Sequence, residues 1–170
     1  MTPENPSRPP WLAPVFAAIE RHDNNGAFLV LFEIYRPDLV RAMAHALSMR
    51  FIDFREQYMQ PLGRDASRIP LAKIGEVVAE SYHDEAESNR SEIKQPSGIV
   101  LHNVEALLAT RDGAARANWM EEFIGWTGRT PVIVPLAVFA NEAPTVSPRV
   151  VRIDPSSVPQ EKLLFRLAGQ

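Results

Sequence analysis

Residues 99–108, with the sequence IVLHNVEALL, constrain the fold of this chain most, because their hydrophobic pattern changes within the segment. Ile99, Val100 and Leu101 form an uninterrupted apolar run after the turn-forming sequence PSG, which predicts a strand that is buried on both faces. From there to Leu108 the apolar residues return at helical spacing. A buried strand followed by a helix is the repeating unit expected of an α/β protein.

The same pattern recurs along the rest of the chain. Apolar runs predict strands at residues 27–32, 50–54, 99–101, 131–140 and 148–153. Amphipathic segments predict helices at residues 11–21, 38–49, 71–82, 114–127 and 158–167, and a short helix that ends at residue 108. Parallel strands need a crossover long enough to hold a helix. The alternation therefore predicts an α/β fold, a three-layer sandwich with a mostly parallel five-stranded sheet.

The length of the chain indicates how it is divided. A chain of 170 residues can bury one sizeable core, so we expect a single α/β domain at residues 11–170. Residues 1–10, MTPENPSRPP, are polar and rich in proline, which is typical of a flexible leader. Residues 83–94 are mostly charged or polar and are predicted to form a frayed helix end or a mobile loop.

Composition excludes several classes of function. The chain has no cysteine, which excludes disulfides, thiolate zinc sites and a cysteine nucleophile. Its net charge of -3 argues against a protein that coats nucleic acid through bulk charge. No segment approaches the roughly 20 apolar residues that cross a bilayer, and the N-terminus lacks a secretion signal. We therefore expect a cytoplasmic protein without membrane contact.

Polar residues follow each predicted strand. Because crossovers are right-handed, the carboxyl ends of parallel strands meet at one edge of the sheet, where α/β proteins place their ligand sites. The segments expected at this edge are residues 33–38, 53–56, 102–105 and 140–142, with Asp154 after the last strand. One hypothesis is therefore an enzyme, such as a small hydrolase, with its catalytic residues at this edge: Asp53, His102, Glu105 and Asn141.

The order of these elements resembles the core of the P-loop ATPases of the AAA-like division. In that core, a first strand leads into the phosphate loop, a later strand ends in paired acids, and the next strand ends in a polar sensor residue. Residues 27–32 resemble the first strand, residues 99–108 resemble the acid-bearing strand with its helix, and Asn141 resembles the sensor asparagine. The resemblance covers about residues 27–153 and implies a P-loop NTPase-like fold.

A narrower resemblance concerns residues 99–108 and the sequence GRTP at residues 128–131. Together with the small size of the chain, these segments are similar to a small P-loop-containing accessory family of bacteriophage-exclusion (BREX) defence systems. This resemblance implies a bacterial partner protein in a multi-component anti-phage system, beside a larger ATPase and DNA-modifying subunits.

The chain departs from the ATPase pattern at both functional motifs. A phosphate loop reads G-x-x-x-x-G-K-[ST]: backbone N–H groups and the lysine bind the phosphates, and the hydroxyl binds Mg²⁺. Residues 33–38 read EIYRPD, without glycine, lysine, serine or threonine, and Glu33 and Asp38 place negative charge where phosphate would bind. His102 and Asn103 stand where the two acids belong. We therefore expect no nucleotide cofactor and no ATP hydrolysis.

The leading hypothesis is thus a non-catalytic, P-loop ATPase-like binding or assembly subunit of an intracellular multi-protein complex. Its partners would be other protein subunits, including a larger ATPase. Trp119 and Trp126 share one face of the helix predicted at residues 114–127. They are either core residues or anchors of an interface with such a partner.

Two arginines allow more than one interpretation. Arg36 either binds an anion or a partner's carboxylate, or pairs with Glu33 or Asp38 of its own loop. Arg129 either acts on a neighbouring subunit, as arginines of related ATPases do, or complements the C-terminal end of a helix.

Nucleic-acid binding is a third hypothesis, and it involves Arg36, Arg41, Arg50 and Arg55. The four histidines show neither H-x-x-x-H nor H-E-x-x-H spacing, so we expect no metal site. His102 is then expected to make a buried hydrogen bond.

Overall fold

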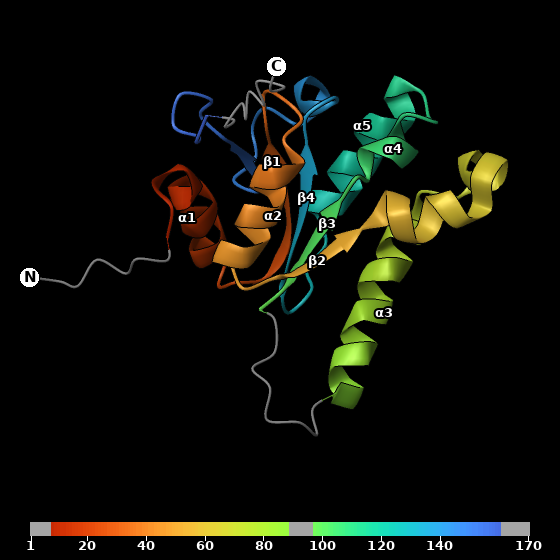
Figure 1. Cartoon of the computed structure of the whole chain (residues 1–170), viewed down its shortest axis with the longest axis horizontal. Coiled ribbons are helices and arrows are strands. Elements are labelled where there is room, and N and C mark those ends of the chain that lie inside the picture. The colour runs from red at the N-terminus through yellow and green to blue at the C-terminus, as the bar shows by residue number, and fades with distance from the viewer. Residues whose placement is uncertain (1–7, 89–96, 161–170) are drawn as a thin grey trace, which may run out of the picture.

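The computed structural model describes residues 8–88 and 97–160. It confirms the predicted α/β fold, because a five-stranded sheet lies between two layers of helices (Figure 1). All neighbouring strands run parallel. Their carboxyl ends therefore meet at one edge of the sheet, which we call the carboxyl edge.

Each predicted strand is present. The strands are β1 (Gly26–Leu31), β2 (Arg50–Asp53), β3 (Ile99–His102), β4 (Pro131–Leu136) and β5 (Val150–Arg152). Their order across the sheet is β2-β3-β4-β1-β5. This order places β1 in the interior of the sheet, between β4 and β5, and all six of its residues are buried.

The prediction for β4 was too long, since the strand ends at Leu136 and not at residue 140. After Leu136 the backbone N–H groups bond to a side chain instead of a neighbouring strand, as described below. Pro135 fits within β4 because β3 pairs with β4 only as far as Ile133. The carbonyl of Leu136 accepts a hydrogen bond from Phe32 on the β1 side. The backbone nitrogen of Pro135, one residue earlier, therefore faces the β3 side, where pairing has already ended and no N–H donor is needed.

Helices cover both faces of the sheet. They are α1 (Ala13–Arg21), α2 (Pro37–Ala46), α3 (Ala72–Ser88), α4 (Glu105–Leu108) and α5 (Gly113–Ile124). Shorter helical turns occur at η1 (Pro10–Leu12), η2 (Arg55–Met59), η3 (Gln60–Arg68) and η4 (Ala140–Glu142). In Figure 1, α1 and α2 lie on one face of the sheet, and α3, α4 and α5 lie on the other.

Some predicted boundaries differ from the observed ones. Helix α3 extends beyond residue 82 to Ser88, so the first part of the charged segment is helical, and residues 89–94 lie outside the described part of the chain. The helix predicted at residues 158–167 is absent from residues 158–160, and the remainder lies outside the described residues. Of the predicted leader, Arg8 pairs with Glu20 of α1 at 2.9 Å. Residues 1–7 are not described.

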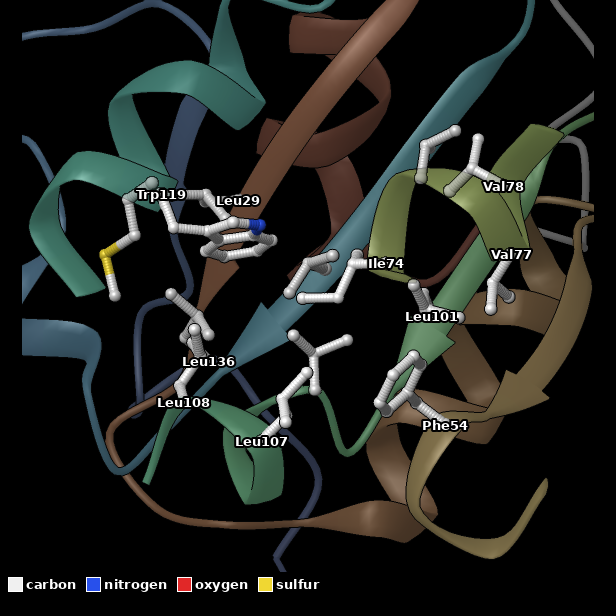
Figure 2. Close-up of a cluster of buried hydrophobic side chains, with 14 of the residues drawn as sticks. Leu29, Phe54, Ile74, Val77, Val78, Leu101, Leu107, Leu108, Trp119 and Leu136 are labelled. Atoms are coloured by element: carbon white, nitrogen blue, oxygen red, sulfur yellow. The ribbon is translucent and has the colours of Figure 1, made fainter. Parts of the chain in front are cut away.

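Two apolar clusters hold the layers together. Alternate residues of each strand point to opposite faces of the sheet, and both sets are apolar in this chain. On one face, Leu29, Leu101 and Leu136 from three strands pack toward Ile74 of α3 and Trp119 of α5 (Figure 2). Each such fully buried side chain contributes about 1.5–3 kcal/mol, so the central strands form a rigid support for the carboxyl edge.

None of the helices in the described ranges has the length and apolar character of a segment that crosses a membrane.

Candidate functional site

The loop between β1 and α2 covers the end of β3 at the carboxyl edge. Tyr35 of this loop stacks on His102, with ring centroids 5.7 Å apart and an interplanar angle of 14°. Tyr35 keeps 49% of its surface exposed, whereas His102 keeps only 4%. The aromatic ring of Tyr35 therefore shields the imidazole from solvent.

Four side chains form a hydrogen-bonded chain at this edge, and we call them the rim cluster: Tyr35, Asp53, His102 and Asn103. The Tyr35 hydroxyl donates to Oδ1 of Asn103 at 2.9 Å, and Nδ2 of Asn103 donates to Oδ2 of Asp53 at 2.9 Å. The hydroxyl oxygen also lies 3.2 Å from Nε2 of His102. Because the hydroxyl has one proton and gives it to Asn103, His102 is the donor in the last bond and carries its proton on Nε2.

The local sequence explains how these residues are presented. Asn103 follows the last residue of β3 and has a positive φ of 62°, a conformation that asparagine tolerates better than most residues. This residue turns the chain into α4, since its carbonyl accepts a hydrogen bond from Ala106. Asp53 ends β2, and its second carboxylate oxygen accepts from the backbone of Glu56 at 3.0 Å. Asp53 and His102 are cross-strand partners in the register of β2 and β3.

The environment of His102 favours the neutral imidazole. Burial lowers the pKa of His102 below its ordinary value of 6.5, and the positive charge of Arg41 acts in the same direction. The negative charge of Asp53 opposes both effects. His102 is therefore a neutral donor at pH 7. The hydrogen bonds of the rim cluster then run in one direction, from His102 through Tyr35 and Asn103 to the Asp53 carboxylate.

Glu105 supports the turn after β4. It is the first residue of α4, and its two carboxylate oxygens each accept a backbone hydrogen bond at 2.7 Å, from Ala137 and from Phe139. Burial raises the pKa of Glu105, and these backbone hydrogen bonds act against that rise. The carboxylate is therefore occupied by the protein itself, and it ends the strand pairing of β4.

Arg36 pairs with Asp38, which agrees with the second of the two interpretations of this residue. Its guanidinium makes two hydrogen bonds to the carboxylate of Asp38, at 2.8 and 2.7 Å, and a further one to the carbonyl of Pro159 at 3.2 Å. The guanidinium lowers the pKa of Asp38. The helix predicted from residue 38 begins one residue earlier, at Pro37, and Asp38 lies in its first turn.

Little space remains at this part of the carboxyl edge. A cavity of about 10 Å³ is left between the loop after β1, the end of β3 and the end of β4. Its lining includes Tyr35, Arg36, His102 and Glu105. Such a volume corresponds to about one water molecule.

The residues of the enzyme hypothesis do not all meet. Asp53 and His102 belong to the rim cluster, and Glu105 lines the same small cavity as His102. Asn141 is exposed in η4 and lines a different cleft of about 650 Å³, together with Asp154 after β5. The expected sensor position is therefore separated from the end of β3.

The remaining candidate residues lie away from the rim cluster. Arg129 is exposed and precedes β4, which places it at the opposite edge of the sheet. Trp119 is buried and stacks on Phe123, with ring centroids 5.0 Å apart. Helix α5 ends at Ile124, so Trp126 lies after the helix and, contrary to the prediction, does not share a helix face with Trp119. Its ring stacks on Tyr82, with ring centroids 6.1 Å apart.

The four arginines of the nucleic-acid hypothesis belong to different elements. Arg50 and Arg55 flank β2 at its opposite ends, and Arg41 lies over the ring of Phe51 at 4.4 Å. Within the part of the chain that the structure describes, no group of three or more potential ligand residues is arranged to hold a metal ion.

Tyr35 was not among the residues that the sequence pointed to, and Asn103 was noted only as a replacement for an acid. The available signal was an aromatic residue in the loop where a phosphate loop would have glycine. In comparisons with protein-family models and with curated proteins, nothing matches this chain.

Proposed function

We propose that this chain is a non-catalytic, P-loop ATPase-like domain that acts as a binding or assembly subunit of an intracellular multi-protein complex. One observation carries the proposal: the protein's own side chains occupy the position where a phosphate loop would hold its ligand. Tyr35 is bound to Asn103, and Arg36 is bound to Asp38.

The N-terminal end of α2 supports this proposal further. In a phosphate-binding protein, the first backbone N–H groups of this helix would face the ligand. Here Asp38 adds a carboxylate in the first turn and Arg36 neutralises it, so a triphosphate would have to displace an ion pair that is already formed. The cavity of about 10 Å³ at this place is far smaller than a nucleotide.

The strand order supports the ATPase-like part of the proposal. β4, which corresponds to the strand before the sensor, lies between β1 and β3. The equivalents of the phosphate loop, the sensor strand and the acid-bearing strand are therefore neighbours at the carboxyl edge. In this chain, the Glu105 carboxylate and the rim cluster connect these same segments. The strand arrangement of an ATPase core is therefore kept, and hydrogen bonds between side chains replace a bound ligand.

Exposed apolar residues at the carboxyl edge support a role in assembly. Ile34 after β1 and Val138 after β4 keep 70% and 69% of their surface exposed, and they follow neighbouring strands. Tyr35 lies beside Ile34 in the sequence and is also half exposed. Apolar side chains that stay exposed after neighbouring strands support a surface at this edge that binds another protein.

The experiment is affinity capture of the tagged full-length chain from its native cell, with mass spectrometry of the captured proteins. We expect a defined set of partners, among them a larger ATPase if the similarity to the BREX accessory family reflects function. Ile34→Lys and Val138→Lys should each reduce capture of these partners at least about tenfold. Val146→Lys is the matched control, since Val146 is 94% exposed and precedes β5 at the other edge.

Two results would contradict the proposal: no specific partner with the wild-type chain, or equal capture by all three variants. The alternative function is a hydrolase or nucleotide-binding enzyme with a relocated site at this edge. Asp53 and His102 are adjacent there, but a substrate would have to move Tyr35 to reach His102. The geometry therefore favours the assembly subunit.

A further inference from the structure

A second feature of the molecule is a groove between α3 and α5, on the face of the sheet that Figure 2 shows. Its volume is about 420 Å³. Ile74 and Val78 of α3 form one wall, Trp119 of α5 forms the other, and Val132 of β4 lies at the bottom. The groove therefore reaches from the surface down to the sheet.

Trp119 presents a polar group in this apolar groove. The residue is only 8% exposed, and Figure 2 shows its indole ring extending from α5 toward Ile74 of α3. Among the described residues, nothing accepts a hydrogen bond from the indole N–H, although the ring lines the groove. The indole nitrogen is not among the fully buried polar atoms without a partner, so solvent reaches it, and its N–H is available to a ligand that supplies an acceptor.

The charge at the groove indicates what kind of ligand fits. Glu122 is the single charged residue among those that line it in the described part of the chain. The amide of Asn118 donates a hydrogen bond to the Glu122 carboxylate at 2.9 Å, which keeps that negative charge beside the opening. An anionic ligand would be repelled there, whereas an uncharged ligand would not.

Gly75 shows that the groove is open at the α3 side. A Cβ atom built at Gly75 would meet no atom of another element within 4 Å. Gly75 lies in the first half of α3 and lines the groove. A larger residue at this position would therefore begin in open space and project into the groove.

We propose that this groove binds an uncharged, largely apolar small molecule with a carbonyl oxygen, such as an aromatic ketone or an ester, which accepts the hydrogen bond of the Trp119 indole. The site is distinct from the rim cluster, and the inference does not depend on the proposed assembly function. The volume of about 420 Å³ lies within the range of ligand pockets, which are mostly apolar with a few placed polar groups.

The depth and polarity of the groove favour a small molecule over a protein partner. An apolar side chain of a partner protein would fill the walls formed by Ile74 and Val132 but would leave the indole N–H without an acceptor. A compact ketone or ester satisfies both parts of the site at once. A second copy of the chain remains a distinguishable outcome of the experiment below.

The experiment uses the full chain and Nile red, an uncharged dye with a carbonyl oxygen that fluoresces in apolar surroundings. We expect saturable binding of Nile red at one site. A matched set of competitors then tests the chemistry: 1-acetylnaphthalene has the carbonyl, 1-ethylnaphthalene lacks it, and 1-naphthoate is anionic. We expect the ketone to bind about fivefold more tightly than the ethyl compound and the anion to bind most weakly.

Three variants assign these preferences to residues. Gly75→Leu fills the groove and favours the helix, so it should abolish dye binding while the chain stays folded by circular dichroism. Trp119→Phe keeps one aromatic ring but removes the five-membered ring with its N–H, so it should bring the ketone and the ethyl compound to equal affinity. Glu122→Gln should strengthen binding of 1-naphthoate about fivefold and leave the ketone unchanged.

Specific results would overturn the inference. Nile red binding that persists in a folded Gly75→Leu variant would place the dye elsewhere. A Trp119→Phe variant that weakens the ketone and the ethyl compound equally would show that the indole N–H recognises no carbonyl. Absence of dye binding, together with a dimer that Gly75→Leu converts to a monomer, would identify a second copy of the chain as the occupant.

Discussion

The hydroxyl of Tyr35 donates a hydrogen bond to Oδ1 of Asn103 at 2.9 Å, between residues 68 positions apart in the sequence. This bond fastens the loop after β1 to the end of β3. The same hydroxyl accepts a hydrogen bond from His102, and the amide of Asn103 donates one to Asp53. Under the proposed ATPase-like assignment, these two places correspond to those that hold the phosphates and the magnesium ion in an ATPase. Here the protein joins them directly.

Tyr35→Phe tests the energy of this connection. The variant keeps the stacked ring and loses the hydroxyl, so we expect the free energy of unfolding to fall by about 1–2 kcal/mol in urea denaturation. Tyr58→Phe is the matched control, because the Tyr58 hydroxyl makes no hydrogen bond within the described residues and should change stability by less than about 0.5 kcal/mol. Equal losses in the two variants would contradict the role given to Tyr35.

The pH dependence of stability tests the neutral state of His102. Burial lowers its pKa in the folded protein, so between the folded pKa and the ordinary value of 6.5 the unfolded chain binds more protons. The contribution of His102 to stability is therefore present above that window and is lost as the pH falls through it. His102→Gln keeps an N–H donor and does not titrate. We expect the wild type to lose more stability than this variant between about pH 7 and pH 5 in urea denaturation. Identical losses would contradict a lowered pKa.

Glu105→Gln tests the turn after β4. Glutamine has one acceptor oxygen, so one of the two backbone N–H groups, of Ala137 or Phe139, would face the amide nitrogen. We expect a loss of about 1–3 kcal/mol in the free energy of unfolding. The exposed Glu121, changed to Gln in the same way, serves as the control and should be within about 0.5 kcal/mol of the wild type. A Glu105→Gln variant as stable as this control would contradict the assignment.

The fold could be predicted because its signal is local. The central strands are buried on both faces, so residues such as Phe28 and Leu29 are all apolar, and turn residues separate these runs. The turn before β1 is an example: Asp23, Asn24 and Gly26 all take positive φ values. The end of β4 could not be predicted, since the sequence stays apolar after Leu136 and only Glu105, from a distant segment, ends the pairing.

The candidate site was less accessible to prediction, because it depends on contacts between distant loops. The carboxyl edge followed from the parallel sheet, and Asp53 and His102 do meet there. No local pattern indicates that Tyr35 lies over His102, or that Asn141 lines another cleft. The helix predicted from residue 38 begins one residue earlier with proline, and Asp38 in its first turn binds Arg36.

Thermal unfolding of the purified full chain with and without about 1 mM ATP and Mg²⁺ tests the central claim most directly, because any ligand of the native state raises the midpoint. We expect no change in the midpoint, because under the proposed function Tyr35, Arg36 and Asp38 take the place of the phosphates and are already bonded to other residues of the protein. A rise of about 5 °C or more that depends on nucleotide concentration would contradict it, because a stabilisation of that size requires a nucleotide bound to the folded protein.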